Sequence, residues 1–206
     1  MKEESAVILA DVSNDGQFVI DASAPYVVNV SVEGAAALLF HRWSVDGVEA
    51  KSKAAKGSKA KKEDDLESYV YRDREGFLCL PTEYFRMSII NAAKYKQDPR
   101  SPRKSAMDLF KAGLVGLSDL CSLGIKEWQY VDRRRVMVQR NGITRHRPAC
   151  YPGWKASMQF QVLVPEYINS HLLNETISAA GRLVGVGDFR PTFGRFAVTH
   201  FAVEQG

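Results

Sequence analysis

The stretch WKASMQFQVLV, residues 154–164, decides the fold. Apolar and polar side chains alternate along it as far as Val162, and this period of two is typical of a β-strand with one buried face. Pro165 ends the strand, because proline has no N–H to donate to a neighbouring strand. The stretch therefore predicts a sheet with one face packed against a core.

Two further segments predict strands of the same sheet. Residues 26–33, YVVNVSVE, repeat the period of two near the start of the chain. Residues 194–203 supply a last strand near its end. An earlier hairpin is expected around Asp15 and Gly16, although this segment also fits a mobile arm.

Helices are expected between these strands. Apolar side chains at spacings of three and four predict a helix over 82–96, after Pro81. Ser105 is expected to begin a shorter helix that extends to about residue 115. A second amphipathic pattern follows residue 165, and Gly181 stands where a glycine commonly ends a helix.

Two insertions interrupt this order of elements. Residues 128–150 predict a β-hairpin around Asn141 and Gly142, a dipeptide suited to a tight turn. Residues 51–68 combine lysines and small residues with an acidic cluster, and predict a flexible loop. The whole predicts an α+β chain, one domain over 1–206, with a ferredoxin-like or RRM-like antiparallel sheet and two helices on one face.

Composition narrows the class of protein. Apolar residues make up 45% of the chain, yet no apolar run approaches the roughly 20 residues of a bilayer span. Glu3 and Glu4 stand where a signal peptide has positive charge. The 3 cysteines form no C-x-x-C pair. We therefore expect a soluble cytoplasmic protein, in a bacterial host, that does not contact a membrane.

No pattern in the sequence indicates catalysis. The 4 histidines are scattered without metal-binding spacing, so we expect no metal, no cofactor and no enzymatic activity. For Asp188, between Gly187 and Phe189, the sequence leaves a catalytic role open. It either acts on a 2′-hydroxyl or a metal, or forms a local turn, which is the commoner role of an aspartate beside glycine.

Charge is distributed unevenly along the chain. The net charge is only +4, but residues 94–155 carry 14 bases against 5 acids, whereas residues 1–50 carry 2 against 8. A concentration of lysine and arginine is the electrostatic pattern of a phosphate-binding surface. The alternative is a solvated face that the acidic third neutralises after folding.

The glycine-rich stretch 181–196, GRLVGVGDFRPTFGRF, is the first candidate site. It lacks the pattern of a dinucleotide or Walker A loop. Glycines allow a backbone to approach a phosphate, and arginines can hydrogen-bond its oxygens. The candidate residues are Arg182, Gly185, Gly187, Arg190 and Arg195. The alternative is a turn that only allows a helix and a strand to pack.

The predicted hairpin is the second candidate site, because arginines are dense along it and aromatic residues lie nearby. The candidates are Arg133, Arg134, Arg135, Arg140, Arg145 and Arg147. The alternative is a hairpin whose arginines pair with acids elsewhere in the fold. In the lysine-rich loop, Lys59 and Lys61 either contact nucleic acid or belong to a solvent-exposed loop that binds nothing.

The order of several motifs resembles the RAMP superfamily of CRISPR effector subunits, in particular small phage-encoded relatives. These motifs are residues 30–43 with LLFHR at 38–42, Leu80-Pro81 before a helix, RHRP at 145–148, and the glycine-rich 185–196. The resemblance implies an RRM-like sheet, a thumb-like hairpin and backbone binding by repeated subunits, with His41 and Arg42 among the contacts. The chain is shorter than most CRISPR backbone subunits and shows no clear ribonuclease aspartate.

These observations predict sequence-independent binding of single-stranded RNA or DNA, as a homo-oligomer, a filament or a subunit of a larger ribonucleoprotein of a phage or mobile element. The alternative is a protein-interaction or structural protein, mimicking a CRISPR subunit, that contacts an acidic protein partner.

Overall fold

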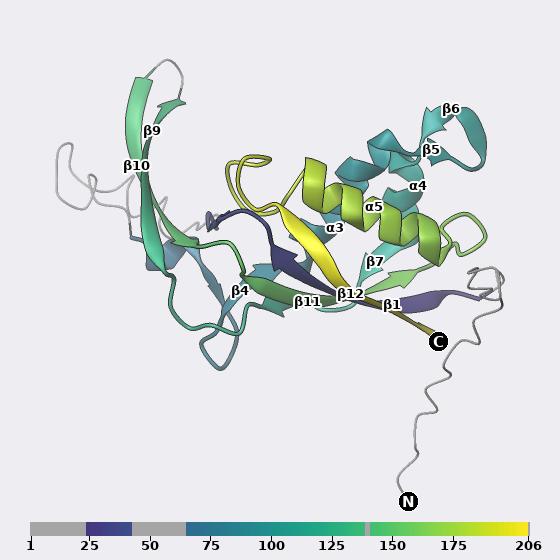
Figure 1. Ribbon diagram of the computed structural model, residues 1–206, viewed down its shortest axis with the longest axis horizontal. Coiled ribbons are helices and arrows are strands. Elements are labelled where there is room, and N and C mark those ends of the chain that lie inside the picture. The colour runs from purple at the N-terminus through teal and green to yellow at the C-terminus, as the bar shows by residue number, and fades with distance from the viewer. Residues whose placement is uncertain (1–23, 43–64, 139–140, 206) are drawn as a thin grey trace, which may run out of the picture.

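The computed structural model describes residues 24–42, 65–138 and 141–205, and Figure 1 shows their arrangement. A four-stranded antiparallel sheet forms the centre, in the order β12-β1-β11-β7. Its strands are β1 (Tyr26–Gly34), β7 (Leu114–Gly116), β11 (Lys155–Val162) and β12 (Phe196–Gln205). The strands predicted over 26–33, 154–164 and 194–203 are confirmed.

Side chains alternate between the two faces of this sheet, as the period of two predicts. Val28 of β1 lies opposite Phe160 of β11, and both are fully buried. Asn29 and Gln159 are also paired in register, and they hydrogen-bond on the polar face. One strip of each strand thus supplies the core, and the other faces solvent.

Helices cover the apolar face of the sheet (Figure 1). They are α3 (Thr82–Ala92), α4 (Met107–Gly113) and α5 (Ser170–Leu183). The two helices expected on this face correspond to α3 and α5, and α4 is the shorter helix expected after Ser105. A 3-10 turn, η2 (Ala93–Tyr95), completes the segment predicted as helix over 82–96. The Asn169 side chain accepts the N–H of Leu172, which caps the start of α5.

Gly181 does not end its helix, contrary to the prediction. The helix continues to Leu183, and Gly181 is buried within it. A Cβ at Gly181 would overlap the carbonyl of Phe196 in β12. The residue is glycine because helix and strand approach each other closely at this position, and Gly185, with a φ of 74°, follows the helix instead.

Smaller sheets flank the core. One contains β2 (Leu38–Leu39), β10 (Asn141–Cys150) and β9 (Tyr130–Val138), in that order. A second contains β3 (Tyr71–Arg72), β4 (Leu78–Pro81) and β8 (Leu120–Ser122), preceded by the 3-10 turn η1 (Glu67–Tyr69). β5 (Gln97–Asp98) and β6 (Ser101–Ser105) form a third. Strands β9 and β10 pair antiparallel and project from one end of the molecule (Figure 1).

Several predicted features lie outside the described residues. They are the hairpin near Asp15, most of the lysine-rich loop with Lys59 and Lys61, and Arg140. All 3 cysteines are buried and unbridged. None of the helices within the described ranges is long and apolar enough to cross a bilayer.

Candidate nucleic-acid interface

The glycine loop, which we define as residues 184–195, is folded tightly against its own chain. Gly185, Gly187 and Gly194 all have φ values in the left-handed region. A Cβ at Gly187 would lie 2.7 Å from the carbonyl oxygen of Leu39 in β2, and one at Gly194 would overlap the carbonyl of Val186. These positions require glycine, because a side chain would push the loop away from the strand.

Backbone hydrogen bonds attach the loop to the rest of the fold. The Gly185 N–H is donated to Ala180 O at 2.8 Å, and the Asp188 N–H to Leu39 O at 3.0 Å. Gly185 is buried, and its contact with phosphate stays a prediction. Gly187 is glycine because of its packing against β2. Close approach within the chain, the alternative given for this loop, accounts for both residues.

A buried ion pair joins the loop to the hairpin. The Arg147 side chain is only 4% exposed, and its Nε pairs with Oδ2 of Asp188. The other Asp188 oxygen accepts the N–H of Phe189 at 2.9 Å, and the ring centroid of Phe189 lies 4.9 Å from the Arg147 guanidinium. The Arg147 guanidinium is thus enclosed by the fold, and the alternative of a hairpin arginine paired with an acid elsewhere accounts for its position. Contact of Arg147 with nucleic acid stays a prediction.

Arg134 strengthens the same junction. Its guanidinium hydrogen-bonds both oxygens of Asp132, at 2.5 and 2.6 Å. It also lies over the rings of Phe189 and Phe193, at 4.8 and 4.4 Å from their centroids. A cation over an aromatic ring is attracted by the negative face of the ring. We call this side of β9–β10, with Asp132, Arg134, Arg145 and Arg147, the inner face.

The opposite side of the hairpin, the outer face, carries Arg133 and Arg135. Strand register places Arg134 opposite Arg145, and their sequence neighbours therefore point the other way. Arg133 and Arg135 are exposed, and no acid among the described residues pairs with either of them. Arg145, on the inner face, is half-buried. The hairpin thus separates structural arginines from solvent-facing ones.

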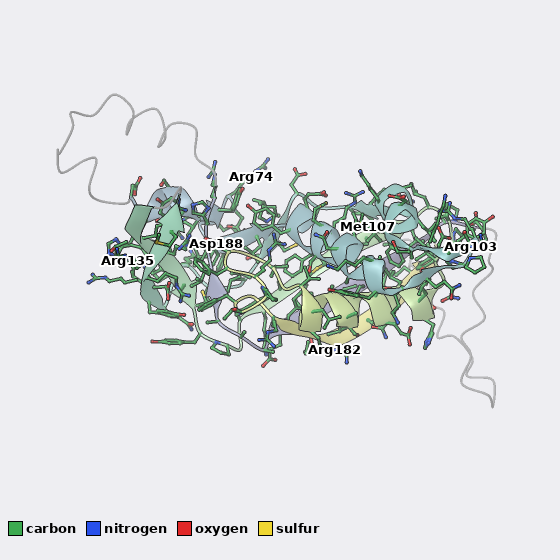
Figure 2. The ribbon with its side chains drawn as sticks, turned by 90° about the horizontal axis from the view of Figure 1, so that it is seen from above. Arg74, Arg103, Met107, Arg135, Arg182 and Asp188 are labelled. Atoms are coloured by element: carbon green, nitrogen blue, oxygen red, sulfur yellow. The ribbon has the colours of Figure 1, made fainter. Side chains whose placement is uncertain are left out.

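The remaining predicted residues lie in different places. Arg182 is exposed on α5, and Figure 2 shows it on a different side of the molecule from Arg135. Arg195 donates to Pro191 O at 2.9 Å, and Arg190 is exposed. The His41 ring lies 5.2 Å from that of Tyr69, and the Arg42 guanidinium lies 5.0 Å from the Tyr71 ring.

Two hollows meet at the glycine loop. The first, of about 360 Å³, is lined by three tyrosines and lies between β3, α3 and the loop. The second, of about 560 Å³, is open and reaches Lys94, Tyr95 and Leu183. Both are lined by Asn91 and Arg190, so together they form one groove across the loop.

Sequence reasoning missed the tyrosines of this groove. Tyr84, Met87 and Asn91 follow one another at helical spacing on the side of α3 that lines the first hollow. An aromatic residue in line with an amide, on the less apolar stripe of a predicted helix, was the available signal. Nothing in the sequence indicated that β3 would bring Tyr71 to the same place.

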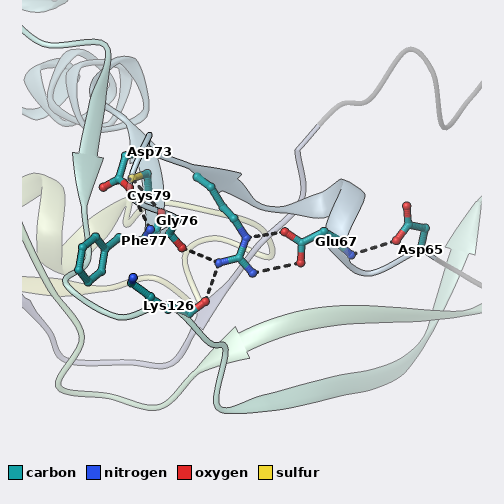
Figure 3. Close-up of polar contacts among 8 residues, drawn as sticks. Asp65, Glu67, Asp73, Gly76, Phe77, Cys79 and Lys126 are labelled. Atoms are coloured by element: carbon teal, nitrogen blue, oxygen red, sulfur yellow. Dashed lines mark hydrogen bonds and ion pairs between the residues drawn. The ribbon is translucent and has the colours of Figure 1, made fainter.

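A hydrogen-bond network around Arg72 fixes β3 (Figure 3). The guanidinium binds both oxygens of Glu67, at 2.5 and 3.1 Å. It also donates to the carbonyls of Gly76 and Lys126, at 2.8 and 2.6 Å. The hydrogen bond from Arg72 lowers the pKa of Glu67, so this carboxylate is charged at neutral pH. Arg72 thereby holds the short strand that carries Tyr71.

Comparisons with known proteins support the fold. No protein-family model and no curated protein matches the sequence. A chain in the cryo-EM structure of Type III-B Cmr-beta bound to cognate target RNA is similar, with a TM-score of 0.52 and 8% identity. The match covers 88% of this chain and 61% of that one, so our chain spans about three fifths of its relative's length. The shared feature is an α+β fold with antiparallel sheets.

Two other solved structures show weaker similarity. A Cas6 product complex aligns with a TM-score of 0.29 and 12% identity, over 86% of this chain and 53% of that one. Csc2 of Thermofilum pendens aligns with a TM-score of 0.37 and 8% identity, over 89% and 68%.

Proposed function

We propose that this chain binds the sugar–phosphate backbone of single-stranded RNA or DNA, without sequence specificity and without catalysis. The observation that carries the proposal is the outer face of β9–β10, where Arg133 and Arg135 are exposed and unpaired by any described acid. Two adjacent arginines facing solvent can form charge-assisted hydrogen bonds with successive phosphates. Such contacts carry no information about base sequence.

The inner face supports this role by holding the hairpin in place. The Arg147–Asp188 ion pair and the packing of Arg134 on Phe193 join the strands to the body of the molecule. A binding surface held in one orientation loses less conformational entropy when its ligand arrives. In this proposal the hairpin acts as a thumb beside the groove at the glycine loop.

The proposal includes assembly into a larger ribonucleoprotein or a filament. The hairpin projects from one end of the molecule (Figure 1). In the proposed assembly, it reaches a strand held by a neighbouring subunit. The Type III-B Cmr-beta structure that contains the similar chain, with a TM-score of 0.52, was solved with cognate target RNA, which favours RNA as the first strand to test. The phage or mobile-element setting stays a prediction from the sequence resemblance.

Fluorescence anisotropy with labelled single strands tests the proposal. We expect binding that weakens steeply between about 50 and 200 mM salt. The double variant Arg133→Ala, Arg135→Ala should reduce the steepness of the slope of log K against log salt by about 1.4. Each lost phosphate contact contributes about 0.7 to this slope for a single strand.

Arg103→Ala, Lys104→Ala is the matched control. Both residues are exposed on β6, and Figure 2 shows Arg103 at the end of the molecule opposite Arg135. This variant removes the same charge and should leave the slope nearly unchanged. Absence of binding to RNA and to DNA at low salt would contradict the proposed function.

The second candidate function is recognition of an acidic protein surface by the same hairpin. The observation that favours it is Met137, which is 69% exposed and shares the outer face with Arg133 and Arg135. An exposed apolar side chain beside cations suits a protein interface better than a phosphate backbone. In that case Met137→Ser would weaken binding to the partner, whereas strand binding would not occur.

A further inference from the structure

The first hollow beside the glycine loop has aromatic walls. Tyr69 and Tyr71 come from η1 and β3, and Tyr84 comes from α3. His41, whose ring lies 5.2 Å from that of Tyr69, also lines the hollow. The volume of about 360 Å³ lies at the lower end of the roughly 300–1,000 Å³ of small-molecule sites. The hollow thus has room for a small planar group.

The rings of Tyr71 and Tyr84 stand nearly perpendicular. Their centroids are 6.1 Å apart with an interplanar angle of 87°, and their hydroxyl oxygens are 3.3 Å apart. Burial raises the pKa of Tyr84 well above its ordinary value, and the nearby Arg190 and Arg42 offset only part of this rise. The Tyr84 hydroxyl is therefore neutral at neutral pH and can donate a hydrogen bond.

Two arginines lie at or beside the walls of the hollow. The Arg42 guanidinium lies over the Tyr71 ring, and Arg190 lines both this hollow and the open one next to it. The only carboxylate among the described lining residues is Asp188, which pairs with Arg147. A ligand with a flat ring and an attached anion fits this distribution of charge.

We propose that the tyrosine-walled hollow takes one unstacked nucleobase of the bound strand, while Arg42 and Arg190 hold the flanking phosphates. The proposal rests on the proposed function, because the base arrives as part of the strand. The open hollow with Lys94 continues the path of the backbone beyond Arg190. A tyrosine ring stacks on any base, so the site adds affinity without selecting a sequence.

The hydroxyls and the amide at the walls have a defined role in this site. Tyr71 and Tyr84 can each donate or accept, and Asn91 can do both. They can satisfy the polar edge of any base that enters.

Binding of two oligonucleotides with equal charge tests the inference. One is a short oligouridine, and the other has the same length and backbone but abasic sugars. Stacking of one base contributes about 1–3 kcal/mol by substitution. The wild-type protein should therefore bind the oligouridine at least about fivefold more tightly. Both should show the same salt dependence.

Tyr84→Ala should reduce oligouridine binding to the abasic level and leave abasic binding unchanged. Met87→Trp should do the same by filling the hollow, since Met87 lines it and is 41% exposed. This second variant deletes no packed side chain, so it tests whether the hollow binds a base even if Tyr84→Ala fails to fold. Tyr167→Ala is the control, because Tyr167 is 39% exposed beneath Arg100 and does not line the hollow.

The outcomes separate the two proposals. Failure of the wild type to bind either oligonucleotide would overturn the proposed function. Equal binding of both oligonucleotides, with the same affinity in Met87→Trp, would overturn the nucleobase site and leave backbone binding intact. Photocrosslinking of 5-iodouridine should label the peptide that contains Tyr84 or Tyr71, and labelling only at Tyr167 would also overturn the site.

Discussion

The inner and outer faces of the β9–β10 hairpin carry arginine in opposite circumstances. On the inner face, Arg147 is buried against Asp188, and Arg134 lies between Asp132 and two phenylalanine rings. On the outer face, Arg133 and Arg135 are exposed. A cation that is paired and desolvated supports the fold, whereas one in solvent stays available for a ligand. The residue type therefore does not assign the role.

The largest expected effect comes from breaking the inner face at Asp188. Asp188→Ala leaves the buried guanidinium of Arg147 without its counter-charge. Removing one partner of a buried pair costs about 3–5 kcal/mol. We expect about 3 kcal/mol, because the Asp188 side chain is 26% exposed. Urea denaturation measures the loss.

A double replacement controls for the charge itself. Arg147→Met with Asp188→Leu removes both charges and should recover most of the stability, because no unpaired charge is left in the core. A loss below about 1 kcal/mol in Asp188→Ala would show that solvent reaches Arg147 and that the two faces of the hairpin differ less than we argue.

The next effect concerns the loop that supplies Asp188. Gly187→Ala should destabilise the protein by about 2 kcal/mol, because the φ of 76° is strained for alanine and the new Cβ would press on the Leu39 carbonyl. Gly153→Ala is the matched control. Its φ is 96°, but a Cβ there meets nothing within 4 Å, so it reports backbone strain alone. Equal losses in a chemical denaturation series would argue against close packing of the loop on β2.

The outer face should show the reverse behaviour. Arg133→Ala with Arg135→Ala should change the free energy of unfolding by less than about 0.5 kcal/mol each, as is usual for exposed residues. Arg134→Ala, one position away, should cost about 1–3 kcal/mol, because it leaves the half-buried carboxylate of Asp132 without its hydrogen bonds. Thermal unfolding followed by circular dichroism compares the outer-face variant and Arg134→Ala with the wild-type protein. A large loss in the outer-face variant would mean that these arginines are structural as well.

The smallest effect tests the aromatic support of Arg134. Phe193→Leu keeps an apolar side chain but removes the ring whose centroid lies 4.4 Å from the guanidinium. The expected loss is about 0.5–1 kcal/mol. In a double-mutant cycle with Arg134→Met, the coupling energy should equal most of that loss. A coupling energy near zero would reduce the contact to ordinary packing.

Local patterns were enough to predict the framework of the molecule. The alternation in 26–33 and 154–164 predicted two strands, each with one buried face, and the structure pairs them as β1 and β11 with these faces on the same side. The apolar spacing after Pro81 predicted α3, although its last turn is 3-10. The short strands β3 and β8 were missed, since two or three residues carry too little periodicity to recognise.

The candidate site was predicted less completely. The sequence pointed to the arginine-rich hairpin and to the glycine loop, and the two meet in the structure. Gly185 and Arg147, both predicted as contacts for nucleic acid, take part in contacts within the fold, and the sequence pattern did not indicate these contacts. The tyrosine hollow was not foreseen, because its walls come from η1, β3 and α3 and meet only after folding.

The sequence by itself determined the strands, the helices and the concentration of positive charge in the middle of the chain, because these depend on neighbouring residues. The tertiary structure alone decided which arginine is buried and which faces solvent. Arg133 and Arg134 are adjacent in sequence, yet only the second meets the glycine loop. The pleat of a strand sends successive side chains to opposite faces, and the partner that waits on one face comes from a distant part of the chain.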